Sequence, residues 1–256
     1  MSLREKWNNG EETLGIWLSV ASSTSAEAAA RVPVGYVCID NQHGVNDYLT
    51  TVSMIQAIEL AGNTPIVRAP WNEPGIIGKM LDAGAQGVVV PMVNSREEAE
   101  AAVRAMRYPP DGARSWGPVM AAARHASYQQ WASEHIAAIP MIETRQAVER
   151  IDEILSVPGI DAVYVGPADL ALSYGLPPAG NEGNPTFDGA LATIVAACER
   201  HGVVPGIHAS GALTSLRREQ GFRMITVGSD LLALRAGLDA EVAAAAGEGG
   251  GGTDLY

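Results

Sequence analysis

The sequence is poor in cysteine, in long apolar runs and in positive charge, and each shortage excludes a class of protein. Its two cysteines, Cys38 in an apolar run and Cys198 in a helical stretch, form no spaced framework for disulfides or structural zinc, so we expect two buried thiols. No uncharged apolar run approaches the roughly 20 residues that a membrane helix requires, which predicts a protein without a membrane partner. The formal net charge of −12 argues against nucleic-acid binding, because that function needs a basic face.

Two further absences concern the beginning of the chain. The segment MSLREKWNNG lacks the apolar core and cleavage site of a secretory signal, so we expect a cytoplasmic protein. No G-x-G-x-x-G fingerprint follows the first predicted strand, which disfavours a doubly wound dinucleotide-binding sheet.

What the chain does have is a regular alternation of short β-branched runs and alanine-rich stretches of helical period. The pattern predicts eight strands, at residues 14–20, 34–39, 65–69, 87–92, 136–142, 162–165, 204–208 and 224–227. It predicts helices at 48–61, 74–83, 95–106, 145–155, 187–201, 212–220 and 230–245. Eight such units in 256 residues favour an α/β fold of the (β/α)8 TIM-barrel class, as a single catalytic domain over 1–245. We expect the glycine-rich segment 246–256 to be a flexible tail.

Polar side chains lie at or just after the ends of five of the predicted strands, where a TIM barrel carries its active site. In chain order they are Asp40 and His43, Arg68, Glu143, Asp169 and His208. Taken singly, an acidic residue after a strand is often only the N-cap of the next helix. Glu143 departs from that pattern, because Thr144 is able to cap the helix and leave the carboxylate free.

Two of these residues suit a metal ion. Hard divalent cations such as Mg²⁺ or Mn²⁺ select carboxylate and water oxygens, and no Cys/His cluster indicates zinc, so we propose Glu143 and Asp169 as ligands. Asp169 ends the turn VGPAD. This turn exposes successive backbone amides, which suits the binding of an anion. Arg68 lies in an apolar strand, where a guanidinium needs a partner. That partner is either a neighbouring carboxylate or an oxygen of a bound substrate, and the sequence leaves both open.

Two segments, 107–127 and 174–185, are longer than barrel loops usually are. Long insertions usually lie on the catalytic face, and we expect both of them there. In the first, Arg114 and Arg124 either close over the site and bind an acidic acceptor or are solvated and subunit-contact residues.

The motifs at the strand ends, in their order, resemble one family over residues 5–245. They are GIWL, IDNQHG, PIVRAPWN, GVVVPMVNSREEAEAAVRAMRYPPDGAR, MIETRQA, YVGPADLA and PGI. The set resembles the HpcH/HpaI aldolase family of metal-dependent class II pyruvate aldolases. Its members include 4-hydroxy-2-oxoheptanedioate aldolase, 2-dehydro-3-deoxyglucarate aldolase and macrophomate synthase.

The resemblance implies a phosphoenolpyruvate/pyruvate-type barrel in which Glu143 and Asp169 hold Mg²⁺, Mn²⁺ or Co²⁺ and pyruvate chelates that ion. It implies that Arg68 stabilises the enolate oxygen and that His43, oriented by Asp40, serves proton transfer. Asp82 matches a carboxylate that reaches the histidine of an adjacent subunit, in a homo-hexamer, a trimer of dimers, with exchanged C-terminal helices. The expected substrate-binding residues are Arg68, Gly166, Pro167, Ala168, Asp169, Trp17, Met141 and His208, with the amides of Ala168 and Asp169 receiving the carboxylate.

Three positions depart from the family pattern. Gln42 stands where the family often has Glu, and Met141 stands where it often has Gln. His208 stands where a small or apolar residue is common, so it either contacts the aldehyde partner or a distal carboxylate, or is a packed, hydrogen-bonded histidine.

We therefore expect a lyase that forms or cleaves 4-hydroxy-2-oxoacids through a metal-bound pyruvate enolate, with an aldehyde as second substrate and oxaloacetate decarboxylation as a side activity. One alternative is a lyase acting on oxaloacetate or on an acyl-CoA of the citramalyl- or malyl-CoA type, although no obvious basic groove for the CoA phosphates is present. The other is a non-catalytic barrel that binds a 2-oxoacid. It would predict loss of a metal ligand or of Arg68, and neither is lost.

Overall fold

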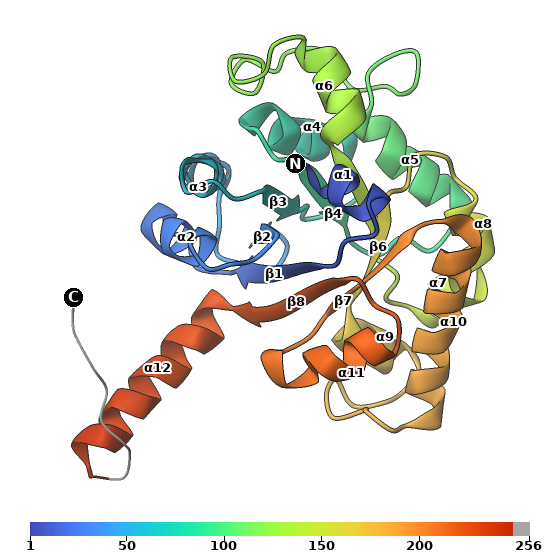
Figure 1. The fold of residues 1–256 in the computed structure, drawn as a ribbon. Coiled ribbons are helices and arrows are strands. Elements are labelled where there is room, and N and C mark those ends of the chain that lie inside the picture. The colour runs from blue at the N-terminus through green and yellow to red at the C-terminus, as the bar shows by residue number, and fades with distance from the viewer. Residues whose placement is uncertain (248–256) are drawn as a thin grey trace.

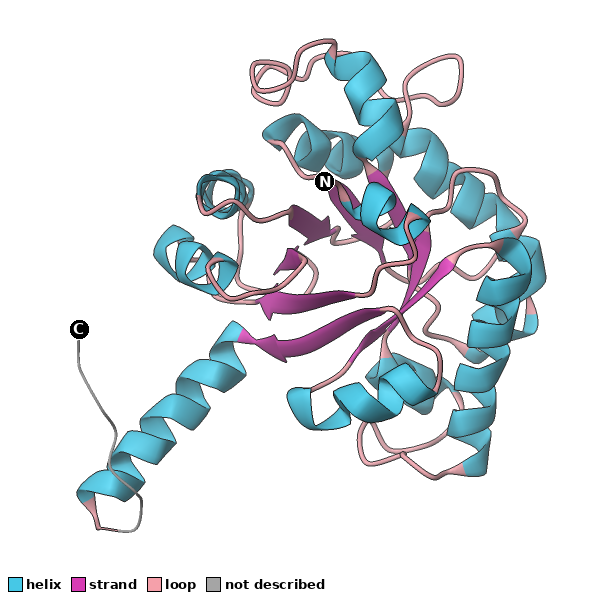
Figure 2. Ribbon diagram, viewed as in Figure 1, coloured by secondary structure: helices cyan, strands magenta, loops and turns pink. Residues whose placement is uncertain are grey.

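Eight parallel strands, each followed by helical structure, form the body of the molecule in a computed structural model that describes residues 1–247 (Figure 1; Figure 2). The strands are β1 (Thr13–Leu18), β2 (Tyr36–Asp40), β3 (Pro65–Arg68), β4 (Gly87–Val90), β5 (Ala137–Pro140), β6 (Ala162–Val165), β7 (Val204–His208) and β8 (Met224–Ser229). Their order in the sheet is β5-β4-β3-β2-β1-β8-β7-β6. Because β1 pairs with both β2 and β8, the sheet curls into a (β/α)8 barrel.

The helices lie around this barrel and at its two ends. They are α1 (Leu3–Asn8), α2 (Ser23–Ala30), α3 (Tyr48–Leu60), α4 (Pro74–Ala83), α5 (Arg96–Met106), α6 (Tyr128–His135), α7 (Arg145–Glu149), α8 (Ile151–Leu155), α9 (Pro167–Ser173), α10 (Pro185–His201), η1 (Gly211–Leu213), α11 (Thr214–Glu219) and α12 (Asp230–Ala245). Side-chain caps start many of them: Asp47 caps α3, Glu73 caps α4 and Thr144 caps α7.

Alternate strand residues separate the core into two parts. One set packs outward against the helices, and the other fills the barrel interior with Trp17, Tyr36, Ile66, Tyr164 and their neighbours. Gly15 makes room in this interior, since a Cβ built there would lie 2.1 Å from the ring of Tyr36. The interior is therefore packed, and the only place for a site on the barrel axis is at an end.

The barrel has one thin seam, between β5 and β6. The two strands are joined by a single isolated bridge, Met141 to Tyr164, with backbone hydrogen bonds from Ile142 N to Tyr164 O (2.9 Å) and from Asp161 N to Ala138 O (3.1 Å). Beyond the bridge, towards the C-terminal ends of the strands, Glu143 and Gly166 lie side by side, since a Cβ built at Gly166 would be 3.4 Å from Cβ of Glu143.

The last helix, α12, projects away from the barrel (Figure 1). It is tied to β1 at its first residue, where the Asp230 carboxylate accepts hydrogen bonds from the backbone N–H groups of Ser19 and Val20. None of its residues is buried, and Leu231, Leu234, Leu238 and Val242 are 55–71% exposed. Among the described helices, none combines the length and apolar character of a membrane span.

The eight predicted strands are all present, within three residues at each end, and every predicted helix is found. The helix predicted at 145–155 is two helices, which meet at Arg150. No helix range was predicted for α1, α2, α6 or α9. The predicted tail at 246–256 falls almost entirely on residues 248–256, outside the described residues.

The expected position of segment 107–127 was wrong. The segment follows α5 rather than a strand, and α5 has already carried the chain back to the N-terminal end of the barrel. There Ala121 N–H donates to Asp82 O, and Arg124 binds Glu59 and the carbonyl of Ala83. Segment 174–185 joins α9 to the start of α10, which runs back towards β7, so that segment does lie on the side of the C-terminal strand ends.

Candidate active site

A buried ion pair lies at the C-terminal ends of β2 and β3. The Arg68 guanidinium donates from Nε to Asp40 Oδ1 (2.9 Å) and from Nη2 to Asp40 Oδ2 (2.6 Å), in a bidentate contact. The two residues are paired because Asp40 and Arg68 are register partners on neighbouring strands. Burial raises the pKa of Asp40, but the hydrogen bonds and charge of Arg68 outweigh it and leave that pKa below its ordinary value. Both ends of the pair are therefore charged at neutral pH.

The same carboxylate organises the loop that follows β2. Asp40 Oδ1 also accepts the backbone N–H groups of Gln42 (3.0 Å) and His43 (3.2 Å). Gly44 is required in this turn, because a Cβ there would lie 2.2 Å from the Asp40 carbonyl oxygen. The contact places the backbone of His43 at the rim, and its imidazole is exposed.

Glu143 is the second buried carboxylate at this end of the barrel. Its Oε1 accepts the N–H of Met92 (2.7 Å), whose φ of +57° is unusual for a residue with a side chain. Its Oε2 faces Gly166, where a Cβ would lie only 2.5 Å away. Burial, aided by the nearby Asp169 carboxylate, raises the pKa of Glu143 to about 7 against the opposing effects of the Met92 N–H and Arg68.

Asp169 lies in the first turn of α9, whose N-cap is Gly166, and its side chain caps no backbone group. The carboxylate is therefore not the helix cap that an acidic residue after a strand often is. Within residues 1–247 no three His, Cys, Asp or Glu side chains gather as a metal cluster. The Glu143 and Asp169 pair, with one member buried and raised in pKa, nevertheless fits a hard divalent cation that completes its shell with water and substrate oxygens.

The floor of this mouth is made by aromatic and apolar side chains. Trp17 is 4% exposed, and the Arg68 guanidinium carbon lies 5.0 Å from its ring centre. Met141 lies beside Gly166, its terminal methyl 3.1 Å from a Cβ built there. His208, at the end of β7, packs edge-on against Trp17 with ring centres 5.3 Å apart.

Asp82 lies elsewhere in the chain. It is near the end of α4, and its Oδ1 accepts from Arg114 Nη2 (2.7 Å), whose guanidinium stacks over Tyr108. The structure thus brings together the expected residues at the mouth but not Asp82, whose predicted role needs a second subunit. Its side chain is 29% exposed, so it remains accessible to one.

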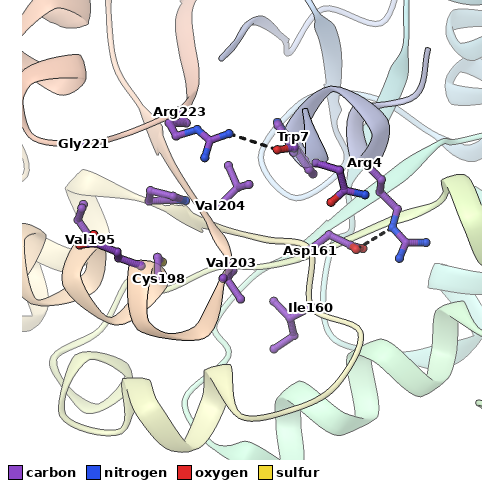
Figure 3. A pocket seen from close by; sticks show the side chains of 14 residues that line it. Arg4, Trp7, Ile160, Asp161, Val195, Cys198, Val203, Val204, Gly221 and Arg223 are labelled. Atoms are coloured by element: carbon purple, nitrogen blue, oxygen red, sulfur yellow. Dashed lines mark hydrogen bonds and ion pairs between the residues drawn. The ribbon is translucent and has the colours of Figure 1, made fainter. Parts of the chain in front are cut away.

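A separate pocket of about 530 Å³ lies at the opposite, N-terminal end of the barrel (Figure 3). Arg4 pairs there with Asp161 (2.7 Å), and Arg223 donates to the Trp7 carbonyl (3.3 Å). These side chains hold α1 against the starts of β6 and β8. None of the residues predicted for the site lines it, so the pocket belongs to the structural end of the barrel.

Comparisons with known proteins identify the family. The model of the HpcH/HpaI aldolase/citrate lyase family matches residues 13–236. The chain belongs to this family. A hydroxypyruvate/pyruvate aldolase of Rhizorhabdus wittichii is 41% identical over 91% of this chain and 94% of its own length.

Two further members of the family show how far the likeness extends. A 4-hydroxy-2-oxo-heptane-1,7-dioate aldolase of Shigella boydii is 37% identical over 90% of this chain and 89% of its own. The crystal structure of a family protein from Burkholderia cenocepacia superposes with a TM-score of 0.88 at 36% identity, covering 94% of this chain and 98% of that one. The fold and the family are thereby established over nearly the whole chain.

Sequence reasoning missed several residues that shape the site. Met92 holds the Glu143 carboxylate through its backbone N–H, and its side chain carries no chemical group that draws attention in a sequence. Gly166, which was expected to bind substrate, also lies against this carboxylate. Tyr36, Tyr164 and Thr226 connect to His208 from inside the barrel. These three could have been found from the alternation of side chains along a strand, because every second residue of a barrel strand points into the interior.

Proposed function

We propose that this family member is a cytoplasmic, divalent-metal-dependent aldolase that forms or cleaves 4-hydroxy-2-oxoacids, with pyruvate or a close analogue as the nucleophilic half and an aldehyde as the other. The observation that carries the proposal is the convergence, at one barrel mouth, of a carboxylate pair (Glu143 and Asp169) with a buried, charged Asp40–Arg68 pair. Because the same nucleophile arises when oxaloacetate loses CO₂, oxaloacetate decarboxylation is the expected side activity.

The chemistry requires a weakly acidic C3–H bond of the 2-oxoacid to be broken near neutral pH. As C3 loses its proton, negative charge develops on the 2-oxo oxygen, and a preorganised guanidinium is suited to stabilise it. Asp40 holds Arg68 in one orientation for that task. The new bond forms between C3 and the aldehyde carbon, whose oxygen takes up a proton; cleavage reverses these events.

His43 is the proposed group for proton transfer, since it lies on the loop that Asp40 organises and its imidazole is accessible at the rim. Glu143 and Asp169 would hold the cation, Mg²⁺, Mn²⁺ or Co²⁺. When bound, it supplies further positive charge to the 2-oxo and carboxylate oxygens of the substrate. The free N–H groups of Ala168 and Asp169 in the first turn of α9 are suited to the substrate carboxylate.

The direct test measures pyruvate release from a panel of 4-hydroxy-2-oxoacids in an assay coupled to lactate dehydrogenase. We expect turnover that EDTA abolishes and that Mg²⁺, Mn²⁺ or Co²⁺ restores. Glu143→Gln keeps the size of the side chain but removes its charge, and should lower kcat/KM by at least about 100-fold. Absence of metal-dependent release across the panel would contradict the proposal, and a fully active Glu143→Gln variant would remove that residue from the metal site.

We further propose that the protein is a homo-hexamer, a trimer of dimers, in which α12 docks on a neighbouring subunit and Asp82 reaches the histidine of another. Two observations support this assembly. The apolar side chains of α12 have no cover within the described part of the chain, and Asp82 lies on the surface with an arginine that holds it in place.

A further inference from the structure

A closed ring of hydrogen bonds joins Glu143 to the loop that follows β4. Glu143 Oε1 accepts the backbone N–H of Met92 (2.7 Å), and the carbonyl oxygen of Met92 accepts Nδ2 of Asn94 (2.7 Å). Oδ1 of Asn94 in turn accepts the hydroxyl of Thr144, the residue that directly follows Glu143. The ring therefore starts and ends on the same short piece of chain after β5.

The donors and acceptors of this ring fit together in one direction only. A carbonyl oxygen can only accept, so the amide atom of Asn94 that faces Met92 is Nδ2, and Oδ1 faces Thr144. The hydroxyl oxygen of Thr144 accepts the N–H of Ala147 (3.0 Å) as the cap of α7, which leaves its proton for Asn94. The half-buried side chain of Asn94 thus joins the loop after β4 to the loop after β5.

Met92 is the strained member of the ring. Its φ of +57° lies in the left-handed region, which is unfavourable for a residue with a Cβ. Such a residue keeps this conformation only where its surroundings hold it. Both backbone groups of Met92 are held here, the N–H by Glu143 and the carbonyl by Asn94. Without Asn94, the N–H that fixes Glu143 Oε1 would be free to turn away.

We propose that Asn94 is a positioning residue for the divalent cation, because through Met92 it holds the Glu143 carboxylate in one orientation. The inference rests on the proposed function, which places the cation on Glu143. A carboxylate that is already fixed loses less conformational freedom when it binds an ion than one that rotates. Groups that orient a metal ligand in this way typically change metal affinity by about 10- to 100-fold. In this role Asn94 touches neither the ion nor the substrate.

The test measures the dissociation constant of Mn²⁺ alone, by isothermal titration calorimetry on the metal-free protein. Asn94→Ala removes both side-chain contacts, and we expect Mn²⁺ binding to weaken about 10-fold or more. Adding Met92→Gly to that variant should recover part of the affinity, because glycine adopts a positive φ without a steric penalty. A purely structural role of Asn94 predicts no such recovery. Circular dichroism verifies folding, and Asn94→Leu, which keeps the volume of the side chain, takes the place of Asn94→Ala should that variant not fold.

Asn63→Ala is the matched control. Asn63 is also half-buried, and its Nδ2 donates to the backbone carbonyls of Ala30 (3.1 Å) and Val34 (3.2 Å). It precedes β3, however, and so lies at the N-terminal end of the barrel. Asn63→Ala should lower Tm but leave the Mn²⁺ dissociation constant within about twofold, because the mouth is at the other end.

Three results would overturn the inference. They are an unchanged dissociation constant in the folded Asn94 variant, an equal loss of Mn²⁺ affinity in Asn63→Ala, and no recovery when Met92→Gly is added. A wild-type protein that neither binds Mn²⁺ nor releases pyruvate from any 4-hydroxy-2-oxoacid would instead contradict the proposed function itself.

Discussion

Arg68 and Asp40 show how a single pair connects stability with chemistry. Both side chains are nearly inaccessible, and each would be a costly buried charge without the other. The sequence left two interpretations of Arg68 open, an ion pair or a substrate contact. The structure shows the ion pair, and the pair's position at the mouth is compatible with the substrate contact as well.

Replacing Asp40 by Asn should therefore affect both properties. Asp40→Asn leaves the guanidinium unpaired, and we expect it to lower the free energy of unfolding by about 3 kcal/mol and kcat by at least about 100-fold. Urea unfolding and steady-state kinetics measure the two effects. A variant with wild-type kcat would show that Arg68 needs no fixed orientation.

The same pair predicts a pH dependence of stability. Because the pKa of Asp40 is lower in the folded protein than its ordinary 3.8, its contribution is present above that pH and is lost as the pH falls through the folded value. The difference in Tm between the wild-type protein and Asp40→Asn should accordingly shrink below about pH 4. A difference that stays constant down to pH 2 would contradict this assignment.

Gly166 matters for the space it leaves empty. In Gly166→Ala the added methyl would meet Glu143 Oε2 at 2.5 Å, while Met92 holds the other oxygen, so the carboxylate has to move. We expect a loss of activity of about 100-fold or more and weaker Mn²⁺ binding in calorimetry. Gly189→Ala is the control, because that exposed helical glycine has nothing within 4 Å of the new methyl. Equal activity of both variants would show that Glu143 tolerates displacement.

At the scale of elements, the strands were more predictable than the helices. Strands β2 to β6 are short runs that are buried on both faces, so their apolar pattern is nearly continuous. Helix α6 carries Tyr128, Trp131 and His135 on its packed face, which is not a pattern of aliphatic residues, and α1 has only two buried residues. The position of segment 107–127 was missed because loop length alone does not reveal which end of the barrel a loop occupies.

The candidate site was predictable where a single ionisable residue stands at the end of a predicted strand. Glu143, Asp169, Arg68 and Asp40 stand directly after or at the ends of predicted strands, and barrel geometry then brings them together. What the sequence could not reveal was contact: the hydrogen bond from Met92, the close approach of Gly166, and the hydrogen bonds of Tyr164 all depend on packing between strands far apart in the sequence.

The helix α1 allows the two ends of the barrel to be tested separately. Trp7 is 5% exposed, and its indole N–H donates to Thr13 Oγ1 (2.9 Å) at the N-terminal end. Trp7→Ala should lower the free energy of unfolding by about 3 kcal/mol and leave kcat within about twofold, because the mouth is at the other end. Urea unfolding measures the free energy and steady-state kinetics measure kcat, both on the same preparation. A folded variant with a large loss of kcat would show that the ends are coupled.

At the scale of the whole molecule, the barrel alone does not account for α12. Leu231, Leu234, Leu238 and Val242 recur at helical spacing and form one apolar stripe on a helix that its own barrel does not cover. A stripe of this kind is expected to be buried against another surface. In the proposed hexamer that surface belongs to a second subunit.

Placing charge on the stripe should break the assembly. We expect the double variant Leu234→Glu, Leu238→Glu to sediment as a smaller particle than the wild-type protein in analytical ultracentrifugation, since two carboxylates would have to be buried. Ala240→Glu, on the opposite side of the same helix, adds a charge without interrupting the stripe and should sediment like the wild type. A double variant of unchanged size would rule out the stripe as a subunit contact.

The hydrogen-bonded chain of Tyr36, Thr226, Tyr164 and His208 also has a consequence for how this family evolves. Each member satisfies its neighbour, so an apolar residue at 208 leaves Tyr164 with one partner fewer in a dry interior. Divergent relatives that place an apolar side chain at the position of His208 should therefore tend to carry Phe instead of Tyr164 and an apolar residue instead of Thr226. The four positions would change as a group, so that a substitution at position 208 at the mouth would be accompanied by substitutions inside the barrel.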